Sequence, residues 1–461
     1  MQRPLEIETP YHCEELSLDN GATGIFCLEK DKISLKLVDY HEFIPRDISL
    51  NCVLRLENGY FVSLFDNIIL SLSNGSATSR IQRSEFISNL ALVGREKCPP
   101  DFKIKSADFT IPHVDQSVRN QNQVEKITNS KFGDDLQTDI FSIECDHLRL
   151  ICYYHVSFSF GFRNGPVGIY PRFAIEFKQG ITLAQYRIWV QSVVRFFSAL
   201  VGFQLEAYEI VVSDLNFEEQ KTYVKENNRA RIFHVYEPER NRDLTKISPK
   251  DLWVGYQFGN AHTTDELNRL SECVKIWINR EPEWKEATHL LWQSLALDDR
   301  IDAERVMMAC RWFEAIPGTQ AIKSISENDL EEITQSANLV AVSLGYVELE
   351  QRIKGSLKCI SKESRKEQFI RLQNEVVVAG FGRYFFDLKF SENLKNAMLY
   401  RGKAAHGHLE VDRDDELAKF AKAIFAMECL CYLLTIKGLP ISPERKKEVR
   451  VTILRNYDSM K

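Results

Sequence analysis

Short apolar bursts alternate with polar residues between Gly21 and Leu72, with the two-residue period of strands that bury one face. Asn58-Gly59 separates two of these bursts and Asn74-Gly75 follows the last one, and both dipeptides favour tight turns between antiparallel strands. Further strand-like runs cover residues 85–93, 108–112, 140–145 and 148–160. This regular spacing predicts a β-sandwich or a strongly curved sheet.

A helical period interrupts the strand pattern once. Downstream of Thr182, a candidate N-cap, apolar residues recur at helical spacing until Gly202. The polar stretch from Asp115 to Asp135 shows no clear period, which is typical of a surface loop. Residues 1–255 are therefore predicted to form a β-rich, sandwich-like domain with one long helix.

The C-terminal part of the chain has a helical period throughout. Residues 251–262, without any period, mark the predicted boundary, and residues 262–461 are predicted to form an all-α bundle, which makes the fold class α+β and multidomain. The predicted helices cover residues 265–280, 283–297, 302–316, 327–358, 363–378, 414–437 and 442–455. The helix over 327–358 is predicted to break near Gly345. A further helix is predicted to be capped by Ser391 and stopped by Gly407.

Composition narrows the class of protein. With 461 residues, 44% hydrophobic and 27% charged, the chain has the make-up of a folded protein of two or three domains. The formal net charge of −6 excludes nucleic-acid binding through bulk charge, so any RNA must bind a local basic patch. Residues 352–371 form one such run, although a solvated helix face explains it more simply, and a second surrounds Lys395 and Lys403.

Cysteine usage and the N-terminus point to the cytoplasm. The 11 cysteines include no Cys-x-x-Cys pair, which argues for a reducing compartment and against a structural zinc or another metal cofactor. The first residues lack an apolar signal core, and no apolar run reaches the ~18 residues that a membrane span needs. We therefore predict a cytoplasmic protein without a cofactor or a membrane partner.

One run in the helical region carries chemistry. Leu394 to His408 reads LKNAMLYRGKAAHGH and places Arg401 five residues before His406. Metal-free RNA cleavage needs a base for the 2′-hydroxyl, an acid for the leaving 5′-oxygen and a cation for the phosphorane, roles that suit histidine and arginine. Since one chain supplies one such pair, two imidazoles at one cleft require a dimer. The simpler alternative is a solvated arginine and a histidine favoured by the helix dipole.

The run RGKAAHG resembles the Arg-x(4–6)-His signature of HEPN-domain ribonucleases, and a β-rich front half followed by a helical bundle is similar to the ApeA anti-phage proteins. The resemblance implies a HEPN-like bundle with catalytic Arg401 and His406, and the basic patch around Lys395 and Lys403 is where we expect RNA contacts. It also implies a homodimer that cuts transfer RNA or another cellular RNA, leaves a cyclic phosphate, and acts as a toxin in abortive infection after a phage-derived trigger. Gly402 departs from the pattern, because many members carry asparagine there.

A second hypothesis belongs to another functional class. The protein would be a catalytically inactive dimerisation or scaffold protein whose β-rich domain senses a ligand, and both Gly402 and the negative net charge favour this alternative. A metal hydrolase has little support, because the sequence contains no His-x-x-x-His or His-Glu-x-x-His motif.

Overall fold

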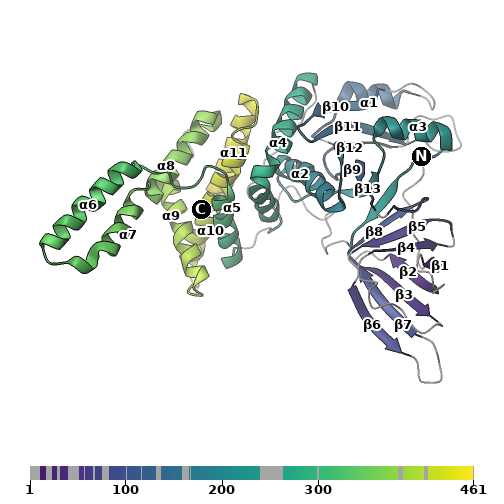
Figure 1. The fold of residues 1–461 in the computed structure, drawn as a ribbon. Coiled ribbons are helices and arrows are strands. Elements are labelled where there is room, and N and C mark those ends of the chain that lie inside the picture. Colours follow the sequence, from purple (N-terminus) through teal and green to yellow (C-terminus); the bar gives the residue numbers. More distant parts are fainter. Residues whose placement is uncertain are drawn as a thin grey trace. The chain divides into compact units, whose positions relative to one another are not determined.

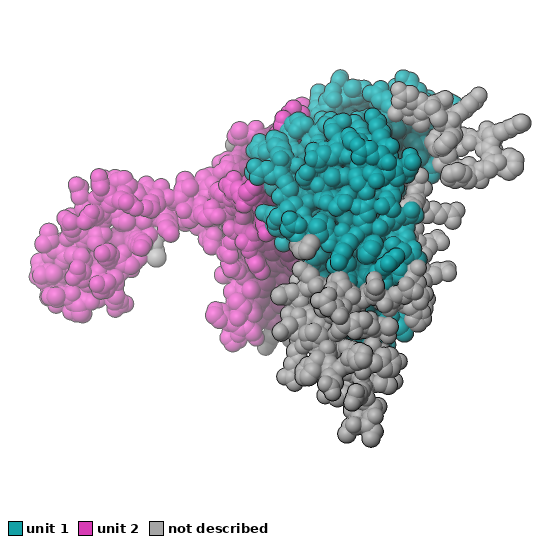
Figure 2. Space-filling model, turned by 45° about the vertical axis from the view of Figure 1, so that its right-hand side comes forward, with its two compact units in different colours: residues 1–194, 205–247, 261–271 teal, residues 195–204, 248–260, 272–461 magenta. Residues whose placement is uncertain are grey.

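The structure is a computed structural model that describes residues 11–16, 23–28, 32–39, 51–56, 58–65, 68–74, 82–99, 101–115, 117–130, 137–157, 166, 168–238, 263–297, 301–382, 388–409 and 414–459. The chain divides into two compact units (Figure 2): unit 1 comprises residues 1–194, 205–247 and 261–271, and unit 2 comprises residues 195–204, 248–260 and 272–461. The predicted boundary at residues 251–262 lies outside the described residues.

Unit 1 carries the strands (Figure 1), which pair antiparallel throughout in the order β10-β11-β12-β9-β13-β14-β8-β5-β4-β1-β2-β3-β7-β6. They are β1 (Tyr11–Leu16), β2 (Thr23–Leu28), β3 (Ile33–Asp39), β4 (Asn51–Leu56), β5 (Phe61–Phe65), β6 (Ile68–Asn74), β7 (Gln82–Ser88), β8 (Leu90–Gly94), β9 (Ile104–Thr110), β10 (Asp139–Glu144), β11 (Leu148–Ser157), β12 (Gly168–Ile181), β13 (Tyr208–Ser213) and β14 (Phe233–Tyr236). The predicted Asn58-Gly59 turn between β4 and β5 is confirmed, with Gly59 at φ 80°.

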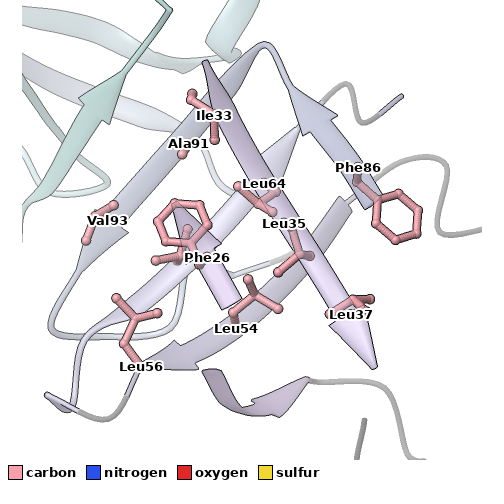
Figure 3. Packing of buried hydrophobic residues seen from close by; sticks show 11 residues of the cluster. Phe26, Ile33, Leu35, Leu37, Leu54, Leu56, Leu64, Phe86, Ala91 and Val93 are labelled. Carbon is pink, nitrogen blue, oxygen red and sulfur yellow. The ribbon is translucent and has the colours of Figure 1, made fainter. Parts of the chain in front are cut away.

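Six of the first eight strands, β2, β3, β4, β5, β7 and β8, share one apolar core. Ile33, Leu35 and Leu37 alternate along β3 and meet Phe26 of β2 and Leu54 of β4, all of them buried. Figure 3 shows these side chains directed into one core shared by several strands of the sheet. The strongly curved sheet, one of the two predicted arrangements, describes this region.

One long helix follows β12, as predicted. Helix α2 (Leu183–Val201) buries most of its second half, and the predicted N-cap is confirmed, because Thr182 Oγ1 accepts a hydrogen bond from the Gln185 amide at 3.3 Å. The Gln185 side chain returns a hydrogen bond by accepting from the Thr182 amide at 3.0 Å.

Two short helices in unit 1 correct the sequence analysis. The predicted loop over residues 115–135 is wrong in its centre, where α1 (Gln121–Thr128) forms behind an Asn120 cap and buries Ile127 alone. Helix α3 (Phe217–Asn227) was not predicted; it buries no residue and begins with the capping box of Asn216 and Glu219. Hydrophobic periodicity reports burial, so helices stabilised chiefly by their caps escape it.

Unit 2 is helical, which confirms the predicted α+β class. Its elements are the greater part of α4 (Thr264–Ser294), then α5 (Ala303–Ala315), α6 (Glu327–Ser343), the 3₁₀ turn η3 (Val347–Leu349), α7 (Glu350–Ile360), α8 (Arg365–Val376), the π-helical turn η4 (Val377–Phe381), α9 (Leu388–Ala405), α10 (Asp414–Ile436) and α11 (Pro443–Ser459). The predicted break near Gly345 is confirmed, because this residue separates α6 from η3 at φ 85°.

Two helix boundaries were predicted wrongly. The separate helices at 265–280 and 283–297 are one helix, α4, with Pro282 inside it. Trp277 before the proline and Leu291 after it are both fully buried, so packing on one face outweighs the lost hydrogen bond. Ser391 is not an N-cap either: α9 begins at Leu388, and the Ser391 hydroxyl instead contacts the Gln373 side chain at 3.3 Å.

A buried ion pair joins two helices of the bundle. Arg305 of α5 donates from Nε to Glu428 Oε1 at 2.8 Å and from Nη2 to Oε2 at 3.0 Å. Both side chains are almost fully buried, with 3% and 1% of their surface exposed. A bidentate pair of this kind fixes the orientation of α5 on α10, and α9 packs against both helices.

Candidate functional site

Helix α9 presents the predicted motif at its C-terminal end. Leu394 and Ala397 are fully buried, and the Cys310 thiol of α5 donates to the Ala397 carbonyl at 3.7 Å. Burial raises the pKa of the Cys310 thiol to about 12, so this cysteine is a packing residue rather than a nucleophile. The prediction that the helix packs through its apolar side and offers its polar end is confirmed.

The end of α9 is fixed by two backbone hydrogen bonds. The His408 amide donates to the Lys403 carbonyl at 2.8 Å, and the Gly407 amide donates to the Ala404 carbonyl at 3.1 Å. Gly407 has φ 69°, the left-handed conformation that completes a Schellman turn, so the prediction that it stops the helix is confirmed. His406 is thereby held at the C-cap position.

Arg401 faces the bundle and has a partner that the sequence did not reveal. Its guanidinium forms a two-pronged ion pair with Glu314 at the end of α5, in which Nη2 donates to Oε2 at 2.8 Å. The two side chains expose 31% and 39% of their surface, so water reaches the pair. Eighty-seven residues separate the partners, and no local pattern in α5 distinguishes Glu314 from other exposed acids.

His406 lies on the opposite, solvent-exposed side of α9. Lys395, Leu399, Gly402 and His406 recur at the spacing of one helix face, and all four are exposed. Among the described residues, no hydrogen bond or ion pair to the imidazole is found. Because Arg401 precedes His406 by five positions, the two side chains leave the helix about 140° apart. The motif thus brings both residues to one helix end without direct contact.

Gly402 stands in open space. A Cβ placed on it would meet no atom within 4 Å, and its backbone is ordinary helix. The position where many HEPN ribonucleases carry asparagine is therefore accessible from solvent, and nothing in the packing requires glycine there.

The two predicted RNA-contacting lysines are both exposed. Lys395 shares the open face of α9 with His406, and Lys403 lies with its Nζ 5.8 Å from the centre of the Tyr400 ring. The first basic run, residues 352–371, is mostly a solvated surface as its simpler explanation predicts. Arg371 is the exception, because its partly buried guanidinium donates hydrogen bonds to Glu363 and Glu375.

Unit 1 contains a polar cluster that the sequence analysis missed. Arg172 of β12 donates from Nε to Asp108 Oδ1 at 2.7 Å and from Nη1 to Glu209 Oε2 at 2.8 Å, and Tyr153 donates to Asp108 Oδ2 at 2.5 Å. Burial and the Asp108 carboxylate raise the pKa of Tyr153, so the phenol keeps its proton. Since the partners satisfy one another across four strands, the cluster has the character of a structural tie between β9, β11, β12 and β13.

Metal chemistry has no visible site in the described part of the chain. No three side chains of histidine, cysteine, aspartate or glutamate converge there as ligands. Asp302, an acid at a helix start, is the N-cap of α5 and accepts from the Arg305 amide at 2.9 Å.

Comparison with known proteins assigns no family: no family model matches the chain, and neither the curated proteins nor the solved structures yield a match. Within the described ranges, none of the helices combines the length and the apolar character that crossing a membrane requires. The function must therefore be argued from the residues themselves.

Proposed function

We propose that the protein is a metal-independent RNA endonuclease that works as a homodimer and acts as an abortive-infection effector in the cytoplasm. The observation that carries the proposal is the end of α9, where a histidine held by a Schellman turn is open to solvent and a partly exposed arginine lies one turn away on another side of the helix. Histidine is the side chain that most often serves as a general acid or base, which is the role that phosphodiester cleavage needs.

In the proposed reaction, His406 of one copy takes the proton from a ribose 2′-hydroxyl. The 2′-oxygen then attacks the phosphorus, and the bond to the 5′-oxygen breaks as His406 of the second copy protonates that oxygen. The products are a 2′,3′-cyclic phosphate and a free 5′-hydroxyl, and no water or metal is consumed. Arg401 binds the non-bridging oxygens, on which negative charge grows in the phosphorane.

The ion pair with Glu314 sets a condition on this mechanism. The guanidinium of Arg401, which would bind the phosphate, is paired with the Glu314 carboxylate in the free protein. Because both side chains are partly exposed, the ion pair contributes about 1 kcal/mol or less to stability. A phosphodiester group of bound RNA can therefore displace the carboxylate at a small cost in free energy. Glu314 would then act as the resting occupant of the phosphate site.

The test compares four proteins in the presence of a chelator: wild type, Arg401→Ala, His406→Ala and the control His408→Ala. His408 is exposed, as His406 is, and follows it by two positions, so the control carries the same chemical change. We expect Arg401→Ala and His406→Ala to cleave RNA at least 100-fold more slowly than wild type and to lose their toxicity to expressing cells. The control His408→Ala should retain both cleavage and toxicity. Cleavage that survives in His406→Ala, or that needs a metal, would place the chemistry elsewhere.

A second candidate function is a catalytically inactive scaffold that pairs through its helices while the β-rich unit senses a ligand. The Arg401–Glu314 ion pair favours it, because the pair ties α9 to α5 and thereby gives Arg401 a structural role. If this function holds, wild type and His406→Ala will affect growth equally, none of the proteins will cleave RNA, and Arg401→Ala will lower the thermal stability.

A further inference from the structure

Helices α6 and α7 form a hairpin, here called the arm (residues 326–360), which extends away from the other helices of unit 2 (Figure 1). Residues 333–347 of the arm contain no charged residue, although 27% of the whole chain is charged. Seven large apolar side chains in this stretch are between 43% and 72% exposed. They are Ile333, Leu339, Val340, Val342, Leu344, Tyr346 and Val347.

The arm buries almost nothing within its own fold. Ala341 is the one buried residue of α6, and no side chain of residues 350–358 is buried. Short helices gain most of their stability from packing an apolar face, so a hairpin with so little buried surface needs a further contact to hold its shape.

The base of the arm, by contrast, is firmly held. Arg371 of α8 donates to Glu363 at 2.6 Å and to the backbone carbonyls of Gly318 and Gln320 at 3.2 and 3.0 Å. The Ser324 amide donates to the Ser361 carbonyl at 2.8 Å across the base. A rigid base presents the apolar surface in a defined direction, as a binding element requires.

The size of the apolar surface fits a protein partner. Side chains of this size at these exposures present on the order of 100 Å² each, so the seven expose about 700 Å² in total. Because Val340 and Val342 leave α6 on different sides, this total is an upper bound on what one partner covers, against the ~800 Å² per partner of a standard protein interface. Patches of several hundred Å² that are contiguous and uncharged mark interaction sites in soluble proteins.

Charge identifies the partner. Helix α6 carries Glu327, Asp329, Glu331 and Glu332 and no basic residue, whereas α7 carries Arg352, Lys354 and Lys358 against the single acid Glu350. The arm is therefore complementary to another arm, with α6 of one copy against α7 of the next. Acids flank the apolar stretch on both sides, at Glu332 and Glu348, which disfavours an anionic membrane surface.

We propose that the arm is the self-association surface of the protein, where two copies of this chain pair about a two-fold axis and each α6 packs on the partner's α7. Asp329, Glu332, Ser336, Leu339 and Val340 recur at the spacing of one helix face and are all exposed, so acidic and apolar contacts follow each other along α6. The inference does not rest on RNA cleavage, although it supplies the pairing that the proposed function needs.

The first experiment measures the mass of the full chain by sedimentation. Wild type should be a dimer at about 10 μM, since interfaces of this size reach micromolar Kd or tighter. Val340→Lys combined with Leu344→Lys should raise Kd at least about thirtyfold. The control is Val378→Lys in η4, which changes an even more exposed valine outside the arm and should leave the dimer intact.

The second experiment reverses the charges. Asp329→Lys with Glu332→Lys makes α6 basic, and Lys354→Glu with Lys358→Glu makes α7 acidic. Each charge-reversed protein alone should be a monomer, because like charges then face each other, and an equimolar mixture should form a heterodimer in which both contacts are restored. A monomeric wild type, a dimer that survives the two lysine substitutions, or a mixture that stays monomeric overturns the proposal. A monomeric wild type that binds neutral lipid vesicles would assign the surface to a membrane instead.

The outcomes separate this proposal from the proposed function. Arm variants that are monomeric but still cleave RNA leave the arm interface standing and overturn the two-copy mechanism of the proposed function. A dimer that resists all arm variants, with cleavage abolished by His406→Ala, keeps the ribonuclease and refutes the arm as its interface.

Discussion

The Glu428→Gln variant should lower the stability of the helical bundle in unit 2 by about 3–5 kcal/mol. This substitution keeps the shape of the side chain and removes the charge that faces the buried Arg305 guanidinium in the bidentate pair. The magnitude follows from the burial of the pair, since only 3% and 1% of the two side chains are exposed, so water cannot replace the missing partner. Phe425, Met427 and Cys429 around Glu428 are also fully buried.

Amide hydrogen exchange in α5 and α10 measures this loss locally, which matters because a chain of two units need not unfold in one step. A change of about 3–5 kcal/mol accelerates exchange in these helices by two to four orders of magnitude, while β-strands in unit 1 keep their wild-type rates. Replacing both partners, as Arg305→Met with Glu428→Leu, should restore the exchange rates to within about tenfold of wild type, because no buried charge is left. A double variant as unstable as Glu428→Gln, or a Glu428→Gln protein within 1 kcal/mol of wild type, would refute the reasoning.

Three further predictions concern the motif and unit 1. Glu314→Gln removes the charge that pairs with the Arg401 guanidinium and should tighten RNA binding up to about fivefold in a filter-binding assay. The control Glu286→Gln, which breaks the exposed pair with Arg311, should leave RNA binding unchanged. Weaker binding by Glu314→Gln would mean that Glu314 has another role. Gly402→Ala should raise the melting temperature through a gain of about 0.5–1 kcal/mol, because the helical position is open and glycine is a poor helix former; a fall would mean that the site requires glycine. Burial and Arg172 lower the pKa of His155 and His234 below 6.5 in the folded protein. Their contribution to stability is therefore present above pH 6.5 and is lost as the pH falls through the folded pKa. The free energy of unfolding in urea should decrease with falling pH in this range, and glutamine at both positions should weaken that dependence.

Elements that bury a periodic face could be predicted from the sequence. The curled strands, α2 and the stop of α9 at Gly407 all follow from apolar spacing and from glycine or turn chemistry. Helices α1 and α3 could not be predicted, because their stability comes from caps and long-range contacts rather than from an apolar stripe. The prediction of α4 was wrong at Pro282, because a proline usually ends a helix. Here α4 continues through Pro282, since buried side chains on both sides of it pack in the core.

The candidate site was predictable in its position and not in its geometry. Spacing alone indicates that Arg401 and His406 lie at one helix end, but the direction of each side chain depends on which face of α9 the bundle covers. That face is set by Leu394 and Ala397, which place Arg401 toward α5 and leave His406 in solvent. Glu314 was missed since ion pairs between distant segments leave no trace in local sequence.

The separation of the two motif side chains favours a reaction across two copies over one within a single copy. Arg401 faces the bundle and His406 faces solvent, so a phosphate bound at the arginine does not meet the imidazole of the same chain by a direct contact. A second α9 approaching along the exposed face, over Lys395, Leu399 and Gly402, would supply an imidazole from outside. The open space at Gly402 allows a close approach there, and under the proposed function an RNA phosphate would displace the Glu314 carboxylate from the Arg401 guanidinium.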